Sequence, residues 1–385
     1  MFLNTQDDEK IQYYLKMLKT VGALSRLFSE SNEPYIQYRI AENLFCKSFN
    51  AENLSRTDCS ADASKAGLGI GIKTFLEKNG STLQKIAEFN SEHSLFRDLS
   101  GEEKLRKVAE LRNERLETTK RIFGLDEMIY HCVTRKEKGI LVYETPMHAV
   151  QLDAMRDIRQ SSKNVISFED GLNEYAFNVT KSTLYKRFST ASILYDFPVE
   201  ILENPFDVLA ELFGKTKDGL VQSESRLREY VYLPLYSMKG GEKLVPEKSG
   251  LNQWNAGGRA RVSDEVYIRI PSWIHDKFPG FFPPRDIPFI LLLPNGSEMS
   301  AKVCQDGSKA LMSNPNSALG NWLLRDVLNL KERELLTYDK LRRIGLDSVV
   351  LYKNEEGKYD IDFTKIGSFE RFTGENQTSK EEPED

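Results

Sequence analysis

The sequence has 385 residues with 40% hydrophobic and 10% aromatic side chains, which is enough for two domains with sizeable cores. No apolar run approaches the roughly 18 residues of a membrane span, and the acidic N-terminus lacks the basic and then apolar form of a signal peptide. The four cysteines and four histidines are scattered, without the spacing of a zinc site or a disulfide framework. We therefore expect a cytoplasmic protein that does not contact membranes.

The formal net charge of −5 is unevenly distributed along the chain. Residues 375–385 contain five acids and one lysine, so this tail carries most of the negative charge. Between residues 252 and 325 there are eight basic and six acidic residues, which allows a mildly basic surface. Charge alone does not indicate a nucleic-acid partner. We expect the acidic tail, 373–385, to be disordered.

Helical patterns dominate the first part of the chain. Apolar residues recur at helical spacing over 8–30 and predict an amphipathic helix. Pro34 precedes a second predicted helix, which carries Glu42. Residues 100–121 form a third, highly charged pattern, with Ser100 as a candidate N-cap, and predict a helix whose charged residues face solvent.

Between the second and third of these helices lies a run rich in glycine, from Asp62 to Phe75. Its glycines alternate with Leu68, Ile70 and Ile72, which predicts a strand that ends on Lys73. The run lacks the glycine directly before the lysine that a phosphate-binding P-loop requires, and it lacks the glycine spacing of a dinucleotide fingerprint. Glycines in a strand indicate instead that another backbone or a ligand approaches closely.

A helix carboxylate (Glu42), a hairpin aspartate (Asp62) and a strand lysine (Lys73) are the groups that a metal-dependent nuclease needs. Two carboxylates can hold Mg²⁺, which polarises a phosphate and lowers the pKa of a bound water. A lysine can orient that water or stabilise charge on the phosphate. The alternative is that Asp62 and Lys73 are an ordinary pair of surface residues on a hairpin.

The order of these three residues, with the segment Leu-Gly-Ile-Gly-Ile-Lys-Thr, resembles the PD-(D/E)XK nuclease superfamily and most of all its mismatch-repair nicking endonucleases. The resemblance implies an α/β core, a mixed sheet flanked by helices, with Glu42 and Asp62 as magnesium ligands. It departs from the family at Gly71, where an acid is usual, so Glu42 or Glu88 would supply the second ligand. Asp58 is a rival for Asp62 as the hairpin aspartate.

Residues 84–88 read as a helix after the glycine-rich strand, where this superfamily often places a glutamine or lysine beside the phosphate. Three residues in it are accessory candidates: Gln84, Lys85 and Glu88. From residue 127 to 188 the pattern turns to strands, with a hairpin turn at 169–171, and these strands can complete the nuclease sheet. The basic segment 180–187 is a candidate for contact with the DNA backbone. We expect a nuclease domain over 1–225 and a linker over 226–250.

Short strands with Pro and Gly turns fill 251–372 and predict an all-β barrel or sandwich. The runs 249–271 and 301–325, together with Phe-Phe-Pro-Pro at 281–284, resemble the C-terminal domain of NgoFVII- and BfiI-type restriction enzymes. That resemblance implies a B-three-like pseudobarrel whose two arms, here 252–261 and 305–316, clamp the major groove of DNA. The first half of the chain lacks the His-x-Lys motif of the phospholipase-D-like catalytic domains in those enzymes.

Residue types in the two arms suit DNA, because Arg, Asn, Gln and Asp can read base edges while Ser and Lys position phosphates. The candidate DNA-binding residues are Asn252, Gln253, Arg259, Arg261, Gln305, Asp306, Ser308, Lys309, Asn314 and Asn316. For Trp254 and Trp322 we expect a role as core anchors.

The resemblances together imply a type II restriction endonuclease, which hydrolyses double-stranded DNA with Mg²⁺ after sequence recognition by the C-terminal domain. They also imply a cognate DNA methyltransferase in the same system, and a homodimer on DNA is one arrangement that would supply two active sites. The missing acid at Gly71 keeps a second interpretation open, a DNA-binding module without catalysis. A third is a reader of modified bases that captures a flipped nucleotide.

Overall fold

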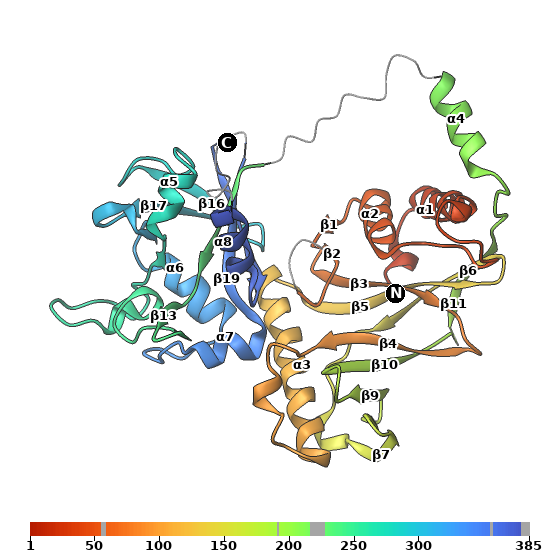
Figure 1. Cartoon of the computed structure of the whole chain (residues 1–385), viewed down its shortest axis with the longest axis horizontal. Helices are drawn as coiled ribbons and strands as arrows, with labels where there is room; N and C mark the ends of the chain where they lie inside the picture. Colours follow the sequence, from red (N-terminus) through yellow and green to blue (C-terminus); the bar gives the residue numbers. More distant parts are fainter. Residues whose placement is uncertain (55–58, 191, 216–227, 355–356, 379–385) are drawn as a thin grey trace, which may run out of the picture. The chain divides into compact units, whose positions relative to one another are not determined.

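The computed structural model describes residues 1–54, 59–190, 192–215, 228–354 and 357–378 (Figure 1). The chain divides into two compact units, and each is described by itself. The first unit comprises Met1–Leu116 and Leu125–Arg226, and the second comprises Glu117–Gly124 and Leu227–Asp385. No helix in the described part of the chain is both long enough and apolar enough to cross a bilayer.

A six-stranded mixed sheet forms the centre of the first unit. Its strands, in spatial order, are β1 (Glu52–Asn53), β2 (Ala63–Lys65), β3 (Leu68–Leu76), β5 (Glu127–Lys136), β6 (Gly139–Pro146) and β11 (Ile193–Pro198). Strands β3 and β5 are parallel, whereas the other neighbours pair antiparallel. Because parallel strands need a crossover connection, β3 and β5 are separated in sequence by a further strand and a long helix.

Two helices, α1 (Asp8–Ala23) and α2 (Tyr38–Phe49), cover one face of this sheet (Figure 1). The predicted helices at 8–30 and after Pro34 are therefore confirmed, although the first ends at residue 23. Helix α2 ends at Asn50, which adopts the left-handed conformation at φ 50° that commonly closes a helix. The apolar stripes of both helices pack on Ile70 and Ile72 of β3, so this face of the sheet is a hydrophobic core.

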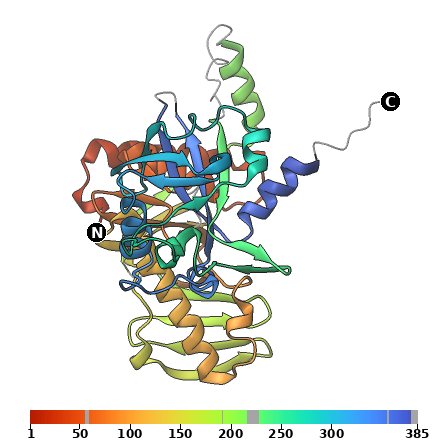
Figure 2. The same ribbon diagram turned by 90° about the vertical axis from the view of Figure 1, so that its left-hand side faces the viewer.

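A second, five-stranded antiparallel sheet completes the first unit. Its strands, in spatial order, are β4 (Ser81–Glu88), β10 (Thr183–Ser189), β9 (Glu174–Asn178), β8 (Val165–Glu169) and β7 (Arg156–Ser162). Helix α3 (Gly101–Phe123) runs across one face of this sheet and packs its apolar side on it (Figure 2). The predicted helix at 100–121 and the hairpin turn at 169–171 are confirmed.

Two expectations for this region were wrong. Residues 84–88 are part of strand β4 and not of a helix, because β4 pairs with β10 along its length and tertiary pairing overrides the helix preference of Gln, Lys and Glu. Strands β8 and β9 do not complete the first sheet, as we had expected, but belong to the second. The remaining helices of the unit are α4 (Pro205–Lys215) and the single turns η1 (Leu3–Thr5), η2 (Ser25–Leu27), η3 (His93–Leu95) and η4 (Leu152–Ala154).

The second unit is built on a seven-stranded sheet. Its strands, in spatial order, are β12 (Tyr230–Pro234), β19 (Leu346–Lys353), β20 (Tyr359–Lys365), β16 (Pro288–Leu292), β17 (Glu298–Cys304), β18 (Ala310–Ser313) and β15 (Ile268–Arg269). The two edge strands, β12 and β15, lie beside each other, so the sheet curls into a nearly closed barrel. This agrees with the predicted all-β barrel. A separate hairpin joins β13 (Ser237–Lys239) to β14 (Glu242–Leu244).

The expected linker over 226–250 differs from the structure, because β12 pairs with β19 and begins the barrel at Tyr230. Glycine and charge in 238–250 reflect a hairpin and not a linker. The helices of this unit are η5 (Gly250–Asn255), α5 (Ser272–Lys277), η6 (Asp306–Ser308), α6 (Ala318–Gly320), η7 (Asn321–Val327), α7 (Tyr338–Ile344) and α8 (Ser368–Thr378). Part of the tail that we expected to be disordered is thus helical up to Thr378, and 379–385 lie outside the described residues.

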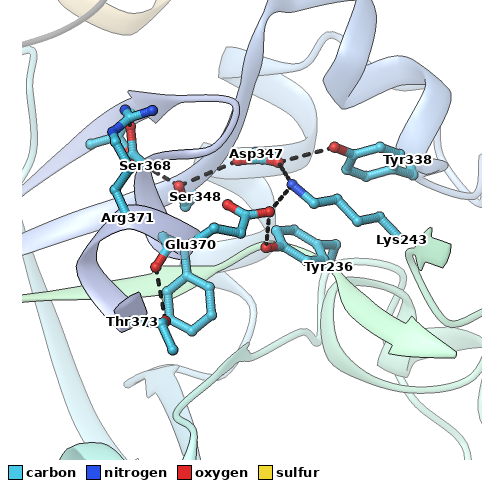
Figure 3. A network of polar contacts seen from close by, with 11 residues as sticks. Tyr236, Lys243, Tyr338, Asp347, Ser348, Ser368, Glu370, Arg371 and Thr373 are labelled. Carbon is cyan, nitrogen blue, oxygen red and sulfur yellow. Dashed lines mark hydrogen bonds and ion pairs between the residues drawn. The ribbon is translucent and has the colours of Figure 1, made fainter. Parts of the chain in front are cut away.

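Helix α8 is attached to the barrel by a polar network (Figure 3). The Lys243 ammonium donates to Asp347 Oδ2 at 2.8 Å and also pairs with Glu370 of α8. Tyr236 donates to Glu370 at 2.8 Å, and Tyr338 donates to Asp347 at 3.0 Å. The side chain of Asp347 is fully buried and has lost its hydration. Its partners must therefore supply the hydrogen bonds and the opposite charge that compensate for the lost water.

Candidate catalytic cluster and nucleic-acid interface

Helix α2 places the Glu42 carboxylate inside the first unit, where the residue is only 4% exposed. Arg39, one turn earlier, contacts Glu42 Oε2 with its Nη1 at 3.2 Å. Burial of a carboxylate requires such a partner, since an isolated buried charge is costly. The i,i+3 spacing of Arg39 and Glu42 on a helix is a signal that the sequence carried and that we had not used.

Strand β3 fixes the position of Asp62. The amide of Ile72 donates to Asp62 Oδ2 at 2.7 Å, and the Asp62 amide donates to the carbonyl of Ile70 at 2.8 Å. The side chain is therefore held at the edge of β3 by two residues that flank Gly71. This local hydrogen bond orients the carboxylate in the structure.

Burial and nearby charged groups shift the pKa of the Asp62 carboxyl. Burial raises the pKa of the Asp62 carboxyl above its ordinary value, while Lys73, the Ile72 amide and Arg39 oppose that rise. Burial also raises the pKa of the Cys46 thiol to about 11, and Glu42 and Asp62 add to this rise. The Ile72 amide, next to Lys73 in the chain, holds the Asp62 carboxylate, so Asp62 lies beside this part of β3, whereas Glu42 comes from helix α2.

Gly71 occupies the position where the nuclease superfamily usually has an acid. A Cβ atom at Gly71 would lie 2.6 Å from the Met147 methyl and 3.2 Å from the Tyr130 ring. Close packing on this face of β3 therefore favours glycine at this position. A carboxylate at this position would need Met147 to move.

The carboxylates of the first unit determine whether it could hold a magnesium ion. The described residues contain no cluster of three or more His, Cys, Asp or Glu side chains that could hold an ion. Mg²⁺ requires only one or two protein carboxylates and keeps several waters, so Asp62 with Glu42 fits its donor preference. Asp58, the rival hairpin aspartate, lies outside the described residues.

The structure places the three accessory candidates on β4, which belongs to the second sheet and not to the sheet that carries Lys73. Lys85 pairs with Glu88 at 3.0 Å, and both side chains are about half-exposed. Gln84 lies beside Lys186 of β10 in the antiparallel register. With Glu88 paired to a lysine on its own strand, Glu42 remains the stronger candidate for a second ligand.

In the second unit, Asn252 is fully buried. Its amide nitrogen donates to the carbonyls of Pro246 and Leu336, and its oxygen accepts from the Leu336 amide at 2.9 Å. All of these partner groups belong to the backbone of the protein. The position of Asn252 therefore argues against the DNA contact that we predicted, and the residue instead joins two segments that are distant in sequence.

The two arginines of the first arm differ in their surroundings. Arg261 is mostly buried and donates to the carbonyls of Ala256, at 2.8 Å, and Gly257, so it shapes the loop 255–262. Arg259 is 56% exposed and forms a two-point ion pair with the buried Glu265. Arg259 is hence the arginine that presents a guanidinium to solvent, whereas Arg261 supports its loop.

The second arm consists of a loop, the buried strand β18 and a turn. Asp306 and Lys309 are exposed, whereas Gln305 and Ser308 are partly buried and adopt positive φ values of 67° and 54°. Two further arm residues, Asn314 and Asn316, are exposed on either side of Pro315, which follows a cis peptide bond. These side chains line two solvent-facing segments of the arm.

The remaining arm residue, Gln253, is partly buried, and its Oε1 atom has no hydrogen-bond partner in the part of the chain that the structure describes. Trp322 is 4% exposed, which confirms its prediction as a core anchor. The roles of the arm residues in DNA binding remain predictions.

The second unit is similar to a known family. Residues 230–355 match the model of the NgoFVII C-terminal B3-like DNA-binding domain. The match begins with β12, twenty residues or so before the start that we expected, and covers about a third of the chain. No curated protein matches the sequence. The prediction of this DNA-binding domain is confirmed, and the nuclease character of the first unit remains a prediction.

Proposed function

We propose that this protein is a type II restriction endonuclease. The second unit reads a sequence in duplex DNA, and the first hydrolyses phosphodiester bonds with Mg²⁺. The observation that carries this proposal is the match of residues 230–355 to a restriction-enzyme DNA-binding domain. In a restriction enzyme such a domain acts beside a catalytic unit, and the first unit offers the Glu42 and Asp62 carboxylates and Lys73 for that role.

Recognition would use the two exposed loop regions of the second unit. Arg259 and Asp306 present groups that can pair with base edges, and the exposed ammonium of Lys309 suits a phosphate oxygen. Arg259 would have to share its guanidinium with Glu265, which fixes its direction before DNA arrives. A preordered side chain loses less conformational entropy on binding.

Catalysis would use Asp62 and Glu42 as magnesium ligands. The bound metal would neutralise charge on the phosphate and lower the pKa of a water. Lys73 would place its ammonium beside the same phosphate, where it stabilises the added negative charge of the transition state. Arg39 holds Glu42 in place through their ion pair.

The wider assignment follows from the same proposal. A restriction endonuclease in the cytoplasm requires a cognate methyltransferase that protects the host DNA. A double-strand break requires two active sites or two successive nicks, and a homodimer on DNA would provide the two sites.

The test is cleavage of a mixed-sequence plasmid with Mg²⁺, beside the same reaction in EDTA. Discrete fragments that require the metal would support the endonuclease, and their ends would define the recognition site. The Lys73→Ala variant should lose cleavage and keep DNA binding, because Lys73 lies in the first unit and the reading loops lie in the second. Cleavage that is equal in both proteins would refute the role of Lys73.

One observation favours a second candidate, a DNA-binding protein without nuclease activity. Gly71 leaves no acid at the usual position, and a Cβ there would lie 2.6 Å from the Met147 methyl and 3.2 Å from the Tyr130 ring. In that case the plasmid would be bound but not cut under any metal condition. Comparison of methylated with unmethylated DNA in the same binding assay would identify a reader of modified bases.

A further inference from the structure

The side of β3 that faces away from α1 and α2 carries Lys73. Ile70 and Ile72 point into the core beneath these helices, and side chains alternate along a strand. Lys73 and Phe75 therefore lie on the opposite face. There the Phe75 ring is 5.7 Å from the ring of Phe188, which belongs to β10 of the second sheet. This face of β3 thus meets the second sheet, as the layers in Figure 1 show.

A second lysine lies in this layer. Lys186 of β10 is only 5% exposed, and its ammonium is 4.7 Å from the centre of the Phe188 ring and 5.9 Å from that of Tyr130. The Tyr130 and Phe188 rings are themselves 5.0 Å apart. Lysine is almost never this deeply buried without a partner.

Among the described residues, the contacts found for the Lys186 ammonium are those with the Phe188 and Tyr130 rings. The nearest acid with an electrostatic influence on it is Asp170. The oxygens of Asp170 are already occupied by the amides of Gln151, Leu172 and Asn173 and by a tyrosine hydroxyl. Ring contacts alone compensate little of the cost of burying a charge, and burial lowers the pKa of Lys186, so a bound anion would favour its charged form.

Lys73 and Lys186 converge on the same place. Cys132 of β5 stands opposite Lys73 in the parallel register. Burial raises the pKa of the Cys132 thiol to about 12, and both Lys186 and Lys73 act against this rise. Tyr130, two residues before Cys132 on the same strand, has its ring 5.9 Å from the Lys186 ammonium. A third cation is close, because Arg112 donates to the Tyr130 hydroxyl at 2.9 Å.

We propose that Lys186 is a second phosphate ligand of the candidate nuclease site, and that it holds a phosphate oxygen together with Lys73. The proposal rests on the proposed function for the source of that phosphate, the DNA backbone, although free inorganic phosphate has the same chemistry. The buried ammonium is dehydrated in advance and binds the anion strongly where water is excluded. The phosphate would supply a counter-charge to the buried ammonium.

Thermal unfolding in sodium phosphate, against sodium chloride of equal ionic strength, tests the binding of the free anion. Phosphate should raise the Tm of the wild-type protein and of the control Lys163→Met, whose lysine is exposed in the turn between β7 and β8. Lys186→Met should melt at or above the wild-type temperature in chloride, since methionine fills the site without a charge, and should show no rise in phosphate. An equal rise in both proteins, or a variant that unfolds, would overturn this role.

Single-turnover cleavage of plasmid DNA tests the backbone source. Lys186→Met should cut about 100-fold more slowly or worse, and it should bind DNA in EDTA as the wild type does. A rate within twofold of the wild type, with Lys73→Ala inactive, would refute the inference and leave the proposed function intact. If the wild type does not cut, the proposed function fails, and the phosphate-dependent Tm alone decides whether Lys186 binds an anion.

Discussion

Asp62 experiences two opposing demands. A magnesium ligand must be ionised, but burial raises the pKa of this carboxyl, so the folded protein without metal disfavours the charge that catalysis would use. The Ile72 amide and Lys73 oppose burial only in part. The buried charge of Asp62 therefore lowers the free energy of unfolding, and a bound cation would raise it again.

This argument makes a prediction for Asp62→Asn in metal-free buffer. The asparagine keeps the acceptor for the Ile72 amide and removes the charge, so its Tm should exceed that of the wild type at neutral pH, by about 2–4 °C for each kcal/mol relieved. A raised pKa means that the wild type regains this stability as the pH falls through the folded-state value and the carboxyl is protonated. The Tm difference should therefore shrink in acid, as calorimetry between pH 4 and 8 would measure.

The same substitution has a functional counterpart. Asp62→Asn should not cut plasmid DNA, and Mg²⁺ should raise the Tm of the wild type but not that of the variant. An asparagine variant that is less stable than the wild type at neutral pH would show that Asp62 is ionised for structural reasons.

The candidate site was named from the sequence through its resemblance to a nuclease family, and the roles of Glu42, Asp62 and Lys73 stay predictions. The sequence also indicated the basic segment 180–187, which contains Lys186, as a candidate for contact with the DNA backbone, but it did not place Lys186 near Lys73, which is 113 positions earlier and lies in the other sheet. No local pattern encodes a contact between two sheets.

At the scale of elements, β4 shows why residues 84–88 misled us. Gln84, Lys85 and Glu88 favour a helix in isolation, and their local spacing gave no contrary signal. The partner strand β10 lies about a hundred residues away, and its pairing decides the structure. The barrel strands were easier to predict because hairpin turns such as 294–297 place their partners next to them in sequence.

Asn252 provides a prediction at this scale, because it connects η5 to the segment that precedes α7. Asn252→Ala would leave two carbonyls and one amide in this buried region without their partner. We expect a loss of about 2–4 kcal/mol in the free energy of unfolding of the second unit. Urea denaturation followed by tryptophan fluorescence would measure it.

If Asn252 were instead a base-reading residue, its alanine variant would unfold like the wild type and lose sequence preference in DNA binding. Asn255→Ala is the matched control, because Asn255 is exposed and its amide makes one hydrogen bond, to the carbonyl of Glu247. That variant should be close to neutral in stability.

Helix α8 depends on the network in Figure 3 in a similar way. Lys243→Met would leave Asp347 buried without its counter-charge and should destabilise the second unit by about 3–5 kcal/mol. Burial already raises the pKa of the Asp347 carboxyl, so the loss should diminish in acid as this group takes up a proton. Denaturant titrations at pH 5 and pH 8 would measure both effects.

The double variant Lys243→Met with Asp347→Leu separates the ion pair from general packing. Removal of both charges should restore most of the stability, since a buried ion pair contributes little beyond an apolar pair of the same shape. A double variant that is as unstable as Lys243→Met would show that the network's shape, and not its charge, supports α8.

For the whole molecule, the division into two units predicts that DNA binding and DNA cleavage can be separated. The net charge of −5 gives no general attraction for DNA, so binding must depend on local groups such as Lys309, which is exposed and has no carboxylate partner among the described residues. Each lysine that contacts a phosphate adds about 0.9 to the slope of log affinity against log salt concentration.

Lys309→Ala should therefore weaken binding to all sequences and reduce that slope by about one, as titrations at several salt concentrations would show. At saturating protein, its single-turnover cleavage rate should equal that of the wild type, because the first unit is unchanged. Lys73→Ala should give the opposite result, with unchanged affinity and no cleavage. Lys331→Ala, which removes an exposed lysine of the second unit outside both loops, should change neither quantity. If Lys309→Ala lowered the cleavage rate at saturating protein, the reading loops would also control the nuclease. DNA binding and DNA cleavage could then not be separated.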